Sequence, residues 1–450
     1  MRIGTKLLSL ALCLLLAISS STCMTEFDSD AITSPGSLSA DSIAHSGSNT
    51  STTIELRSHK PIAPEDLSGG AVAEAESEPD PWPIVNNVRL AFTGDLMVHD
   101  VQIDAAYNPA DGTYSFMSYF EYITPYLKDA DYTIGNLETT LSGAAAVYGG
   151  YPVFNTPDEF AEALKAAGFN MLITANNHSN DRGESGIRRT IEMLDSLGFD
   201  HIGTYASQEE QETIFHKEIN GIRFAFLNYT YSTNGIPLAS GKPYLVNMLD
   251  EVLMQRQIRQ ARSEGAEMIV VMPHMGDEYA ESPATHYRNL AQRLCEYGAD
   301  IVMASHPHVL QPTEVIEVDN WDGTMRTCFI AYSMGNFVSG QRNIPCDVGA
   351  VFYLDFEKIV DEHGSSVRIT QASFAPTWVL FRNPSWEIDI KVLPVSDTLK
   401  AVDAGEDLGI GIWDIARMRD VHRQTTRKML GEEVPESEMK PVYTLYKALS

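Results

Sequence analysis

The stretch "IVMASHPHVLQP", residues 301–312, joins an apolar run to two histidines that are separated by a single proline. Side chains at positions i and i+2 of a β-strand point to the same side, so a continuing strand would direct His306 and His308 toward one object. A polar turn with both imidazole rings in solvent is the alternative interpretation of these residues taken alone. The rest of the sequence decides between the two.

The same arrangement, an apolar run followed by polar residues, recurs along the chain from Asn87 onward. Buried strands are predicted at residues 88–95, 131–138, 170–178, 222–230, 267–278, 300–308 and 326–337. Helices with apolar residues at three- and four-residue spacing are predicted at 157–169, 186–199, 249–265 and 286–299. This alternation predicts an α/β domain over residues 87–395, and the strand patterns at 348–359 and 366–381 would extend or cover its sheet.

Two segments precede this domain and one follows it. Residues 1–23 have the order of an export signal, with basic residues, then an apolar core, then small residues. Cys23 would carry a lipid if the signal is of the lipoprotein kind. Residues 24–86 are rich in Ser, Thr, Glu and Pro, which predicts a disordered acidic linker. Residues 396–450 are predicted to form a helical C-terminal extension.

The charge balance excludes one class of partner. The chain has 32 Lys and Arg residues against 61 Asp and Glu residues, a net charge of -29. Phosphate backbones are bound by clustered Lys and Arg, and the sequence contains no basic run. We therefore expect no nucleic-acid partner.

The five cysteines do not predict a disulfide framework. Cys13 and Cys23 fall in the predicted signal, which leaves three dispersed cysteines. Cys295 lies in an amphipathic helix pattern and is predicted to be a buried, apolar side chain. A bond between Cys328 and Cys346 stays open, because export permits disulfides but the spacing does not require one.

Polar residues suited to metal binding stand at the ends of five predicted strands: Asp95, Glu138, Asn177 with His178, His274, and His306 with His308. Binding sites in α/β sheets gather where the carboxyl ends of strands meet. A single strand-end Asp is often only a helix cap, but five such strand ends together supply the mixed oxygen and nitrogen ligands of Zn, Mn or Fe. A carboxylate such as Glu138 can bridge two cations.

Six motifs carry a resemblance to a known family. They are TGDLM, IGNLETTLSG, ITANNHSNDRG, MPHMGDEY, ASHPHVLQP and AYSMGNF, in this order along the chain. With them the sequence resembles the bacterial capsule synthesis family CapA, which is involved in poly-γ-glutamate capsules and is similar to the calcineurin-like metallophosphatases. The resemblance covers roughly residues 88 to 380. It implies a four-layer α/β/β/α sandwich of the metallophosphatase type.

The resemblance also implies a role for each polar residue at the strand ends. It implies six metal ligands: Asp95 and His308 for a first ion, Asn177, His274 and His306 for a second, and Glu138 bridging the two. His178 would stabilise or protonate a leaving group, and Asp181 would orient His178. The cofactors would be one or two divalent metal ions, of Mn, Fe or Zn.

One position departs from the pattern of the metallophosphatases. They usually carry a histidine two residues after the first aspartate, where this chain has Met97. A thioether is a poor ligand for hard cations, so the first ion would be weakly held, water-rich or absent. His99 would share the face of Met97 if the strand continued, and is the alternative ligand.

Two classes of function follow. The first is an extracytoplasmic, metal-dependent hydrolase of phosphoesters, with γ-glutamyl amides as the second choice of bond. The alternative is a non-catalytic factor that binds the capsule polymer, or its synthesis and export machinery, around a vestigial metal site. In both cases we expect a protein that is secreted or anchored to the outer face of the cytoplasmic membrane. An acidic polymer would contact this acidic protein through bound metal or through a local arginine such as Arg182 or Arg342.

Overall fold

The computed structural model describes residues 83–320, 323–382 and 388–448. The predicted signal, 1–23, and nearly all of the predicted linker, 24–86, lie outside the described residues. No helix in the described part of the chain combines the length and the apolar character needed to cross a membrane.

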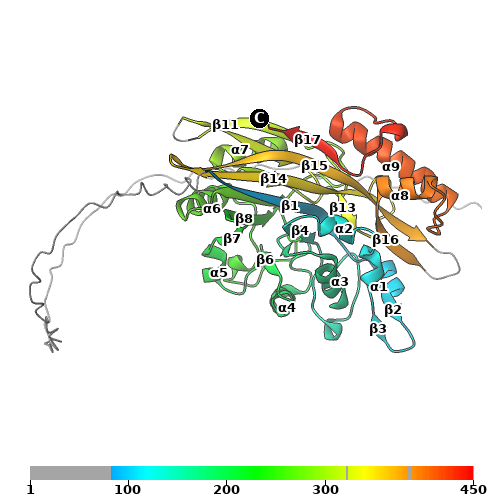
Figure 1. Ribbon diagram of the computed structural model, residues 1–450. Coiled ribbons are helices and arrows are strands. Elements are labelled where there is room, and N and C mark those ends of the chain that lie inside the picture. The colour runs from blue at the N-terminus through cyan, green and yellow to red at the C-terminus, as the bar shows by residue number, and fades with distance from the viewer. Residues whose placement is uncertain (1–82, 321–322, 383–387, 449–450) are drawn as a thin grey trace, which may run out of the picture. The chain divides into compact units, whose positions relative to one another are not determined.

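Nine strands of the described chain form the larger of two main sheets (Figure 1). The path through the sheet is β16-β15-β14-β1-β4-β5-β6, while β13 pairs with β1 and β17 pairs with β15. The bounds are β1 Ile84–Leu96, β4 Tyr132–Leu137, β5 Met171–Ile173, β6 Asp200–Ile202, β13 Asn336–Val338, β14 Val348–Asp361, β15 Gly364–Arg382, β16 Asp389–Pro394 and β17 Tyr443–Lys447. Because β1, β4, β5 and β6 are parallel, their carboxyl ends lie on one edge.

Six strands of the described chain form the second sheet, in the order β11-β12-β10-β9-β8-β7. Their bounds are β7 Phe215–Ile219, β8 Ile222–Thr230, β9 Met268–His274, β10 Ile301–Met303, β11 Thr313–Asp319 and β12 Met325–Ala331. The four central strands, β8, β9, β10 and β12, are parallel, so this sheet too has a carboxyl edge. A two-stranded hairpin, β2 Tyr107–Asn108 with β3 Thr113–Tyr114, lies apart from both sheets.

The helices complete a four-layer sandwich (Figure 1). Their bounds are α1 Asp100–Ala106, α2 Thr124–Leu127, α3 Glu159–Ala167, α4 Gly183–Ser196, α5 Gln208–Glu212, α6 Glu251–Ser263, α7 Thr285–Tyr297, α8 Val395–Asp403 and α9 Ile412–Leu430. The predicted helices at 157–169, 186–199, 249–265 and 286–299 are α3, α4, α6 and α7.

Alternation along single strands shows how the layers pack. Phe92 of β1 and Val270 of β9 belong to one core between the two sheets. The neighbouring residue of β1, Ala91, instead packs with α3 through Leu164. On the far side of the second sheet, Val271 of β9 packs with α6 and α7. Successive strand residues thus face opposite layers, and the predicted α/β/β/α sandwich is confirmed.

The C-terminal extension is only partly helical. It contains α8 and α9, as predicted, but it ends in β17, which pairs antiparallel with β15. Val395, Met418 and Val421 of these helices join the core between the sheets. A five-residue strand at the chain end carries too few residues for its period to be recognised in the sequence.

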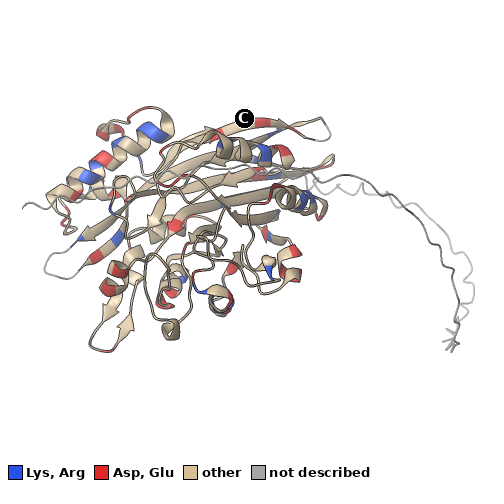
Figure 2. Ribbon diagram, turned by 180° about the vertical axis from the view of Figure 1, so that it is seen from behind, with Lys and Arg blue, Asp and Glu red and all other residues tan. Residues whose placement is uncertain are grey.

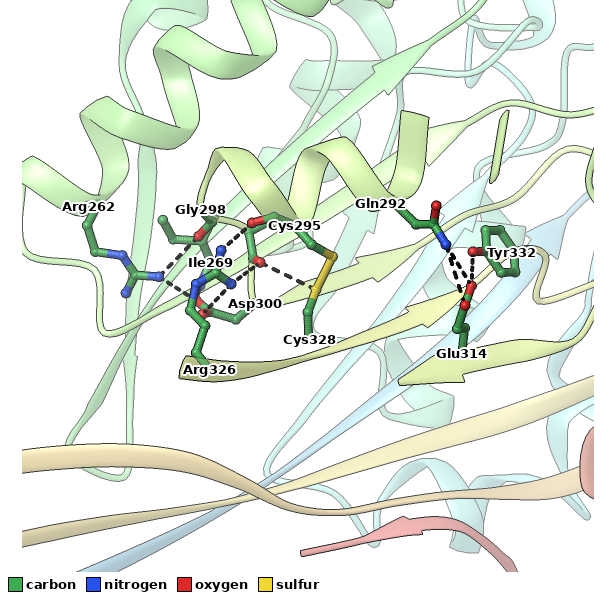
Figure 3. Close-up of a disulfide and its surroundings, with 11 residues drawn as sticks. Arg262, Ile269, Gln292, Cys295, Gly298, Asp300, Glu314, Arg326, Cys328 and Tyr332 are labelled. Carbon is green, nitrogen blue, oxygen red and sulfur yellow. Dashed lines mark hydrogen bonds and ion pairs between the residues drawn. A yellow bond between two sulfur atoms is a disulfide. The ribbon is translucent and has the colours of Figure 1, made fainter. Parts of the chain in front are cut away.

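Cys295 is buried, as predicted, but it is not a free thiol, and the bond left open between Cys328 and Cys346 is not formed. Cys295, near the end of α7, forms a disulfide with Cys328 of β12, whereas Cys346 is free and buried (Figure 3). The two bonded residues are 33 positions apart. Their pairing depends on α7 packing against the outer face of the second sheet, which the spacing of cysteines does not reveal.

Lys and Arg residues lie interspersed with Asp and Glu residues along the described chain (Figure 2). Helix α9 has five Lys and Arg residues, and each of them has an acidic partner. The pairs are Arg417 with Asp347 and Asp420, Arg419 with Asp403 and Glu436, Arg423 with Asp420, Arg427 with Glu433, and Lys428 with Glu281. The charge of the Lys and Arg residues of α9 is therefore compensated within the described part of the chain.

Candidate metal centre

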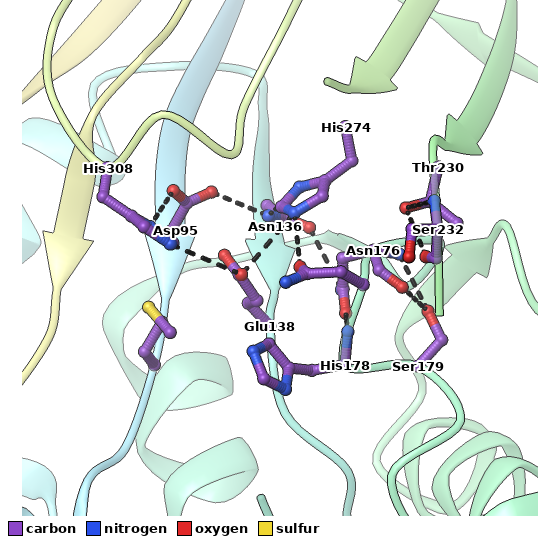
Figure 4. Close-up of polar contacts among 12 residues, drawn as sticks. Asp95, Asn136, Glu138, Asn176, His178, Ser179, Thr230, Ser232, His274 and His308 are labelled. Carbon is purple, nitrogen blue, oxygen red and sulfur yellow. Dashed lines mark hydrogen bonds and ion pairs between the residues drawn. The ribbon is translucent and has the colours of Figure 1, made fainter. Parts of the chain in front are cut away.

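The six predicted metal ligands are all buried, and they come from the carboxyl ends of both sheets. Asp95 lies near the end of β1, Glu138 one residue after β4, and His274 at the end of β9. Asn177 follows β5, and the two histidines 306 and 308 follow β10. Figure 4 shows Asp95, Glu138, His274 and His308 converging from these separate elements.

Asp95 is held by Gly335, Asn136 and His308, which come from three separate segments of the chain. Gly94 is required before it, because a Cβ there would clash with the carbonyl oxygen of Gly335, which accepts the Asp95 N–H at 3.0 Å. Asn136 of β4 stands opposite Asp95 and donates its Nδ2–H to Asp95 Oδ1 at 2.8 Å. Burial by itself would raise the pKa of Asp95, but the hydrogen bond and charge of His308 lower it to about 2.

Glu138 lies where two groups of candidate ligands meet. Its side chain is fully buried, and neither carboxylate oxygen has a hydrogen-bond partner among the described residues. Oε1 is 3.5 Å from His274 Nε2 and 3.9 Å from His308 Nε2. One group joins Glu138 to Asp95 and His274, the other joins it to His306 and His308, and the ligand atoms within each group lie within 4.8 Å of one another.

The chemistry of these groups fits a divalent cation. A buried, unpartnered carboxylate is costly for a folded protein unless a ligand completes it. Burial and the nearby Asp95 raise the pKa of Glu138 well above its usual value, and Nδ1 of His306 is also buried without a partner. The two groups combine the ligands differently from the resemblance, which pairs Asp95 with His308 and His274 with His306.

His274 is fixed through both ring nitrogens. Its Nδ1 is 3.2 Å from Asn136 Nδ2, which can only donate, so Nδ1 accepts that hydrogen bond. Its Nε2 then carries the proton and donates to Asn177 Oδ1 at 2.8 Å. Burial lowers the pKa of His274 to about 3, which keeps the ring neutral. Two of the predicted ligands, His274 and Asn177, are therefore in contact, and the His274 ring carries no charge that would repel a cation.

His306 and His308 converge, but not by the strand geometry predicted for them. β10 ends at Met303, and the backbone φ angles of His306 and His308 are 107° and 59°. Residues other than glycine rarely adopt positive φ, so the sequence does not reveal this turn. The ring centroids lie 5.7 Å apart and both side chains are buried. The alternative of a solvent-exposed turn is wrong as well.

The two histidines differ in charge. Burial and the neighbouring His274 lower the pKa of His306 to about 2. Burial also opposes the charged form of His308, but the carboxylates of Glu138 and Asp95 raise the pKa of His308 to about 9. At neutral pH His308 therefore holds a proton that a metal ion must displace.

We predict that binding of a divalent ion at pH 7 releases protons, and that metal affinity rises as the pH increases from 7 toward 9, because His308 loses its proton in that window. Addition of metal to weakly buffered protein containing a pH indicator measures the release. His308→Ala should release fewer protons than wild type. Metal binding at pH 7 without proton release would contradict the prediction.

The His178 imidazole lies beside these ligands (Figure 4) and has polar contacts of its own. Its Nδ1 lies 2.8 Å from Asp181 Oδ2, and the same oxygen accepts the Phe154 N–H at 2.7 Å. The Phe154 ring meets the imidazole edge-on, with centroids 4.6 Å apart. The carboxylate accepts from Nδ1, and the other ring nitrogen, Nε2, lies 3.4 Å from Asn234 Nδ2.

Met97 and His99 both lie beside the centre without joining the ligand groups of the described residues. Met97 is buried, and its sulfur accepts a hydrogen bond from the Ser339 hydroxyl at 3.9 Å. β1 ends at Leu96, so the face that Met97 and His99 would have shared does not continue. Nδ1 of His99 accepts the Gly340 N–H at 3.1 Å, and burial lowers the pKa of His99 to about 4.

Sequence reasoning missed several residues that shape the centre. Asn136 and Asn336 contact predicted ligands, and both stand inside the motifs IGNLETTLSG and AYSMGNF, which carried the signal. The Tyr231 ring lies 4.5 Å from that of His306. Of the two arginines proposed for polymer contact, Arg182 donates to the Val153 carbonyl and Arg342 to the Val379 carbonyl.

Comparison with known proteins adds relatives to this geometry. Capsule biosynthesis protein CapA of Bacillus anthracis is 31% identical over 275 residues, which cover 57% of this chain and 61% of that protein. PGA biosynthesis protein CapA of Bacillus subtilis (strain 168) is 30% identical over 259 residues, covering 56% and 64%. The chain thus spans less than two thirds of the length of either relative.

Two solved structures are similar in part. The calcineurin-like phosphoesterase YfkN from Bacillus subtilis has a TM-score of 0.39 at 15% identity, covering 65% of this chain and 91% of that one. The NAD nucleotidase NadN of Haemophilus influenzae has a TM-score of 0.40 at 12% identity, covering 79% and 66%.

The family described as bacterial capsule synthesis protein PGA_cap matches residues 89–341. This range is more than half of the 450 residues and contains every predicted metal ligand. The chain therefore belongs to the bacterial capsule synthesis protein family.

Proposed function

We propose that this capsule synthesis protein is a divalent-metal-dependent phosphoester hydrolase that acts outside the cytoplasmic membrane. One observation carries the proposal: the fully buried carboxylate of Glu138 has no hydrogen-bond partner among the described residues and lies between two groups of His and Asp ligands. A mixed oxygen and nitrogen donor set of this kind suits Mn, Fe or Zn. One or two such ions would be held by Asp95, Glu138, Asn177, His274, His306 and His308.

The bound cation would polarise a phosphoryl oxygen and lower the pKa of water. The protein's own residues would do the rest. The hydrogen bond from Asn136 keeps Asp95 oriented toward the site. Asp181 accepts from Nδ1 of His178, so the doubly protonated ring of His178 would donate its Nε2 proton to the leaving-group oxygen.

Two features support action outside the cytoplasm. The N-terminal residues 1–23 have the composition of an export signal, with Cys23 as the position for a lipid anchor. The disulfide between Cys295 and Cys328 belongs to oxidising compartments. The partners we propose are the capsule polymer or the machinery that makes and exports it.

Hydrolysis of p-nitrophenyl phosphate and of its diester tests the proposal directly. We expect turnover after reconstitution with Mn, Fe(II) or Zn and none after chelation. A γ-glutamyl anilide serves as the second substrate class. Protein that binds metal but hydrolyses none of these substrates would favour the second candidate, a non-catalytic capsule factor.

The presence of Met97 favours the second candidate, the non-catalytic capsule factor. Its buried thioether stands two residues after Asp95, where an imidazole would complete a metal site. We predict that Met97→His tightens the binding of one ion and raises hydrolysis, since it adds a nitrogen donor. Metal titration and phosphoesterase assay measure both, with Met97→Leu as a control that keeps the volume but adds no donor. Tighter binding without any hydrolysis would support the non-catalytic factor.

A further inference from the structure

The side chains of Asp95 and Asn336 together decide which nitrogen His308 presents to the centre. Nδ1 of His308 lies 3.0 Å from Asp95 Oδ2 and 3.2 Å from Asn336 Oδ1. Both of these atoms accept hydrogen bonds, so Nδ1 carries the proton and donates. Nε2 is left facing Glu138, 3.9 Å from its Oε1. The orientation of the Asn336 amide therefore matters to the ligand.

The loop that follows β13 fixes this amide. Nδ2 of Asn336 donates to the Cys346 carbonyl oxygen and to Gln341 Oε1, both at 2.9 Å. Since both partners are acceptors, the amide nitrogen must lie on this side and the amide oxygen must face His308. The orientation of the Asn336 amide therefore depends on its hydrogen bond to the Cys346 carbonyl oxygen.

The end of the loop is fixed in turn by α9. Asp347 follows Cys346, and its carboxylate accepts Arg417 Nη2 at 2.7 Å and Arg417 Nε at 2.9 Å. Trp378 Nε1 donates to the same carboxylate at 2.8 Å. The Asp347 side chain is 4% exposed and that of Arg417 13%. A two-pronged guanidinium contact with a buried carboxylate holds both groups in one geometry.

We infer that α9 is a working part of the metal centre, in which Arg417 acts as a positioning residue through Asp347, the Cys346 carbonyl and Asn336 on His308. The inference rests on the proposed metal site. Arg417 lies beyond residues 89–341, so it assigns a role to the C-terminal extension outside the range matched by the family.

Three variants of the full chain test it. Groups that orient metal ligands typically contribute 10–100-fold to affinity, so Arg417→Met should weaken binding of Zn or Mn by about tenfold or more. Arg417→Lys keeps the positive charge but cannot make the two-pronged guanidinium contact. Its metal affinity should therefore lie between those of wild type and Arg417→Met. Arg419→Met removes a charge from the same helix, where the partners are Asp403 and Glu436, and should bind as wild type does. Titrations are made below the melting temperature of every variant, and equal affinity in all of them would overturn the inference.

The same substitutions in a His308→Ala protein show whether Arg417 positions His308 or only stabilises the fold in general. In His308→Ala, the ligand on which Arg417 acts is missing, so adding Arg417→Met should weaken metal binding no further. If the two losses add, Arg417 does not act through His308 and the inference is wrong. Should Arg417→Met fail to fold, Arg417→Lys in the same background gives the same comparison.

A measurement on metal-free protein distinguishes failure of this inference from failure of the proposed function. The imidazole nitrogen signals of His308, identified by their loss in His308→Ala, should shift in Arg417→Lys and stay in place in Arg419→Met. If wild type binds no metal but the His308 signals shift in Arg417→Lys, the metal site is wrong and the effect of Arg417 on His308 stands. If wild type binds metal but the His308 signals do not shift in Arg417→Lys, only the inferred effect of Arg417 on His308 is wrong.

Discussion

Glu138→Gln should remove nearly all bound divalent metal and abolish hydrolysis, while making the metal-free protein more stable. The loss follows because both ligand groups share this carboxylate. A neutral amide is a weaker ligand, and neither group keeps three charged or imidazole donors without it. Elemental analysis and phosphoesterase assay measure the two losses.

The gain in stability follows from the raised pKa of Glu138. A carboxyl group whose pKa is higher in the folded state favours folding below its unfolded pKa, and this contribution is lost as the pH rises toward the folded value. At neutral pH the metal-free fold therefore bears the cost of a buried, unpartnered acid, which Gln removes. We expect the free energy of unfolding of metal-free Glu138→Gln to exceed that of wild type by about 1–3 kcal/mol. The difference should grow as the pH increases above about 4.5, near the usual pKa of a glutamate.

Thermal melts of chelated protein between pH 5 and pH 8 check this, with Glu362→Gln as the control. Glu362 is an exposed acid in the turn between β14 and β15, so the same substitution there should change neither metal content nor melting temperature. A destabilised metal-free Glu138→Gln, or one that keeps its metal, would show that Glu138 is not the shared ligand.

His178→Ala should lower hydrolysis by about 10²–10⁴-fold for substrates with alkyl leaving groups and leave metal content unchanged. The reason is that His178 would protonate the departing oxygen, which an alkoxide needs and a p-nitrophenolate hardly does. The defect should therefore shrink strongly with p-nitrophenyl esters. Asp181→Asn should show the same dependence in weaker form, because it leaves the imidazole in place and disturbs the Nδ1 contact that orients it.

His201→Ala provides the matched control. His201 also forms an imidazole–carboxylate pair, with Asp195 at 3.1 Å, but it lies on β6 outside the centre. Its removal should leave the rates with both kinds of leaving group unchanged. Equal loss of rate for good and poor leaving groups in His178→Ala would mean that His178 positions substrate or metal and does not transfer a proton.

The elements whose side chains repeat regularly could be predicted from the sequence, because burial on one or both faces imposes the pattern. β9 ends on His274 where its apolar run ends, and α7 follows the three- and four-residue spacing of residues 286–299. The clustering of the ligands could also be predicted, since parallel strands bring their carboxyl ends together.

What depends on packing between distant segments could not be predicted. Cys295 and Cys328 meet only because α7 lies on the second sheet. His306 and His308 meet through two positive φ angles, which local sequence does not specify for histidine. Asn336 lies in the motif AYSMGNF, but its contact with His308 depends on the register in which β13 pairs with β1, which the motif does not reveal.

Elemental analysis of the purified protein after reconstitution with Mn, Fe(II) or Zn measures directly whether this centre holds metal. We expect one to two divalent ions per chain in wild type and close to none in Glu138→Gln. Wild-type protein that retains no divalent ion from any of the three, while folded and with its disulfide formed, would contradict the metal centre and leave the non-catalytic capsule factor as the better account.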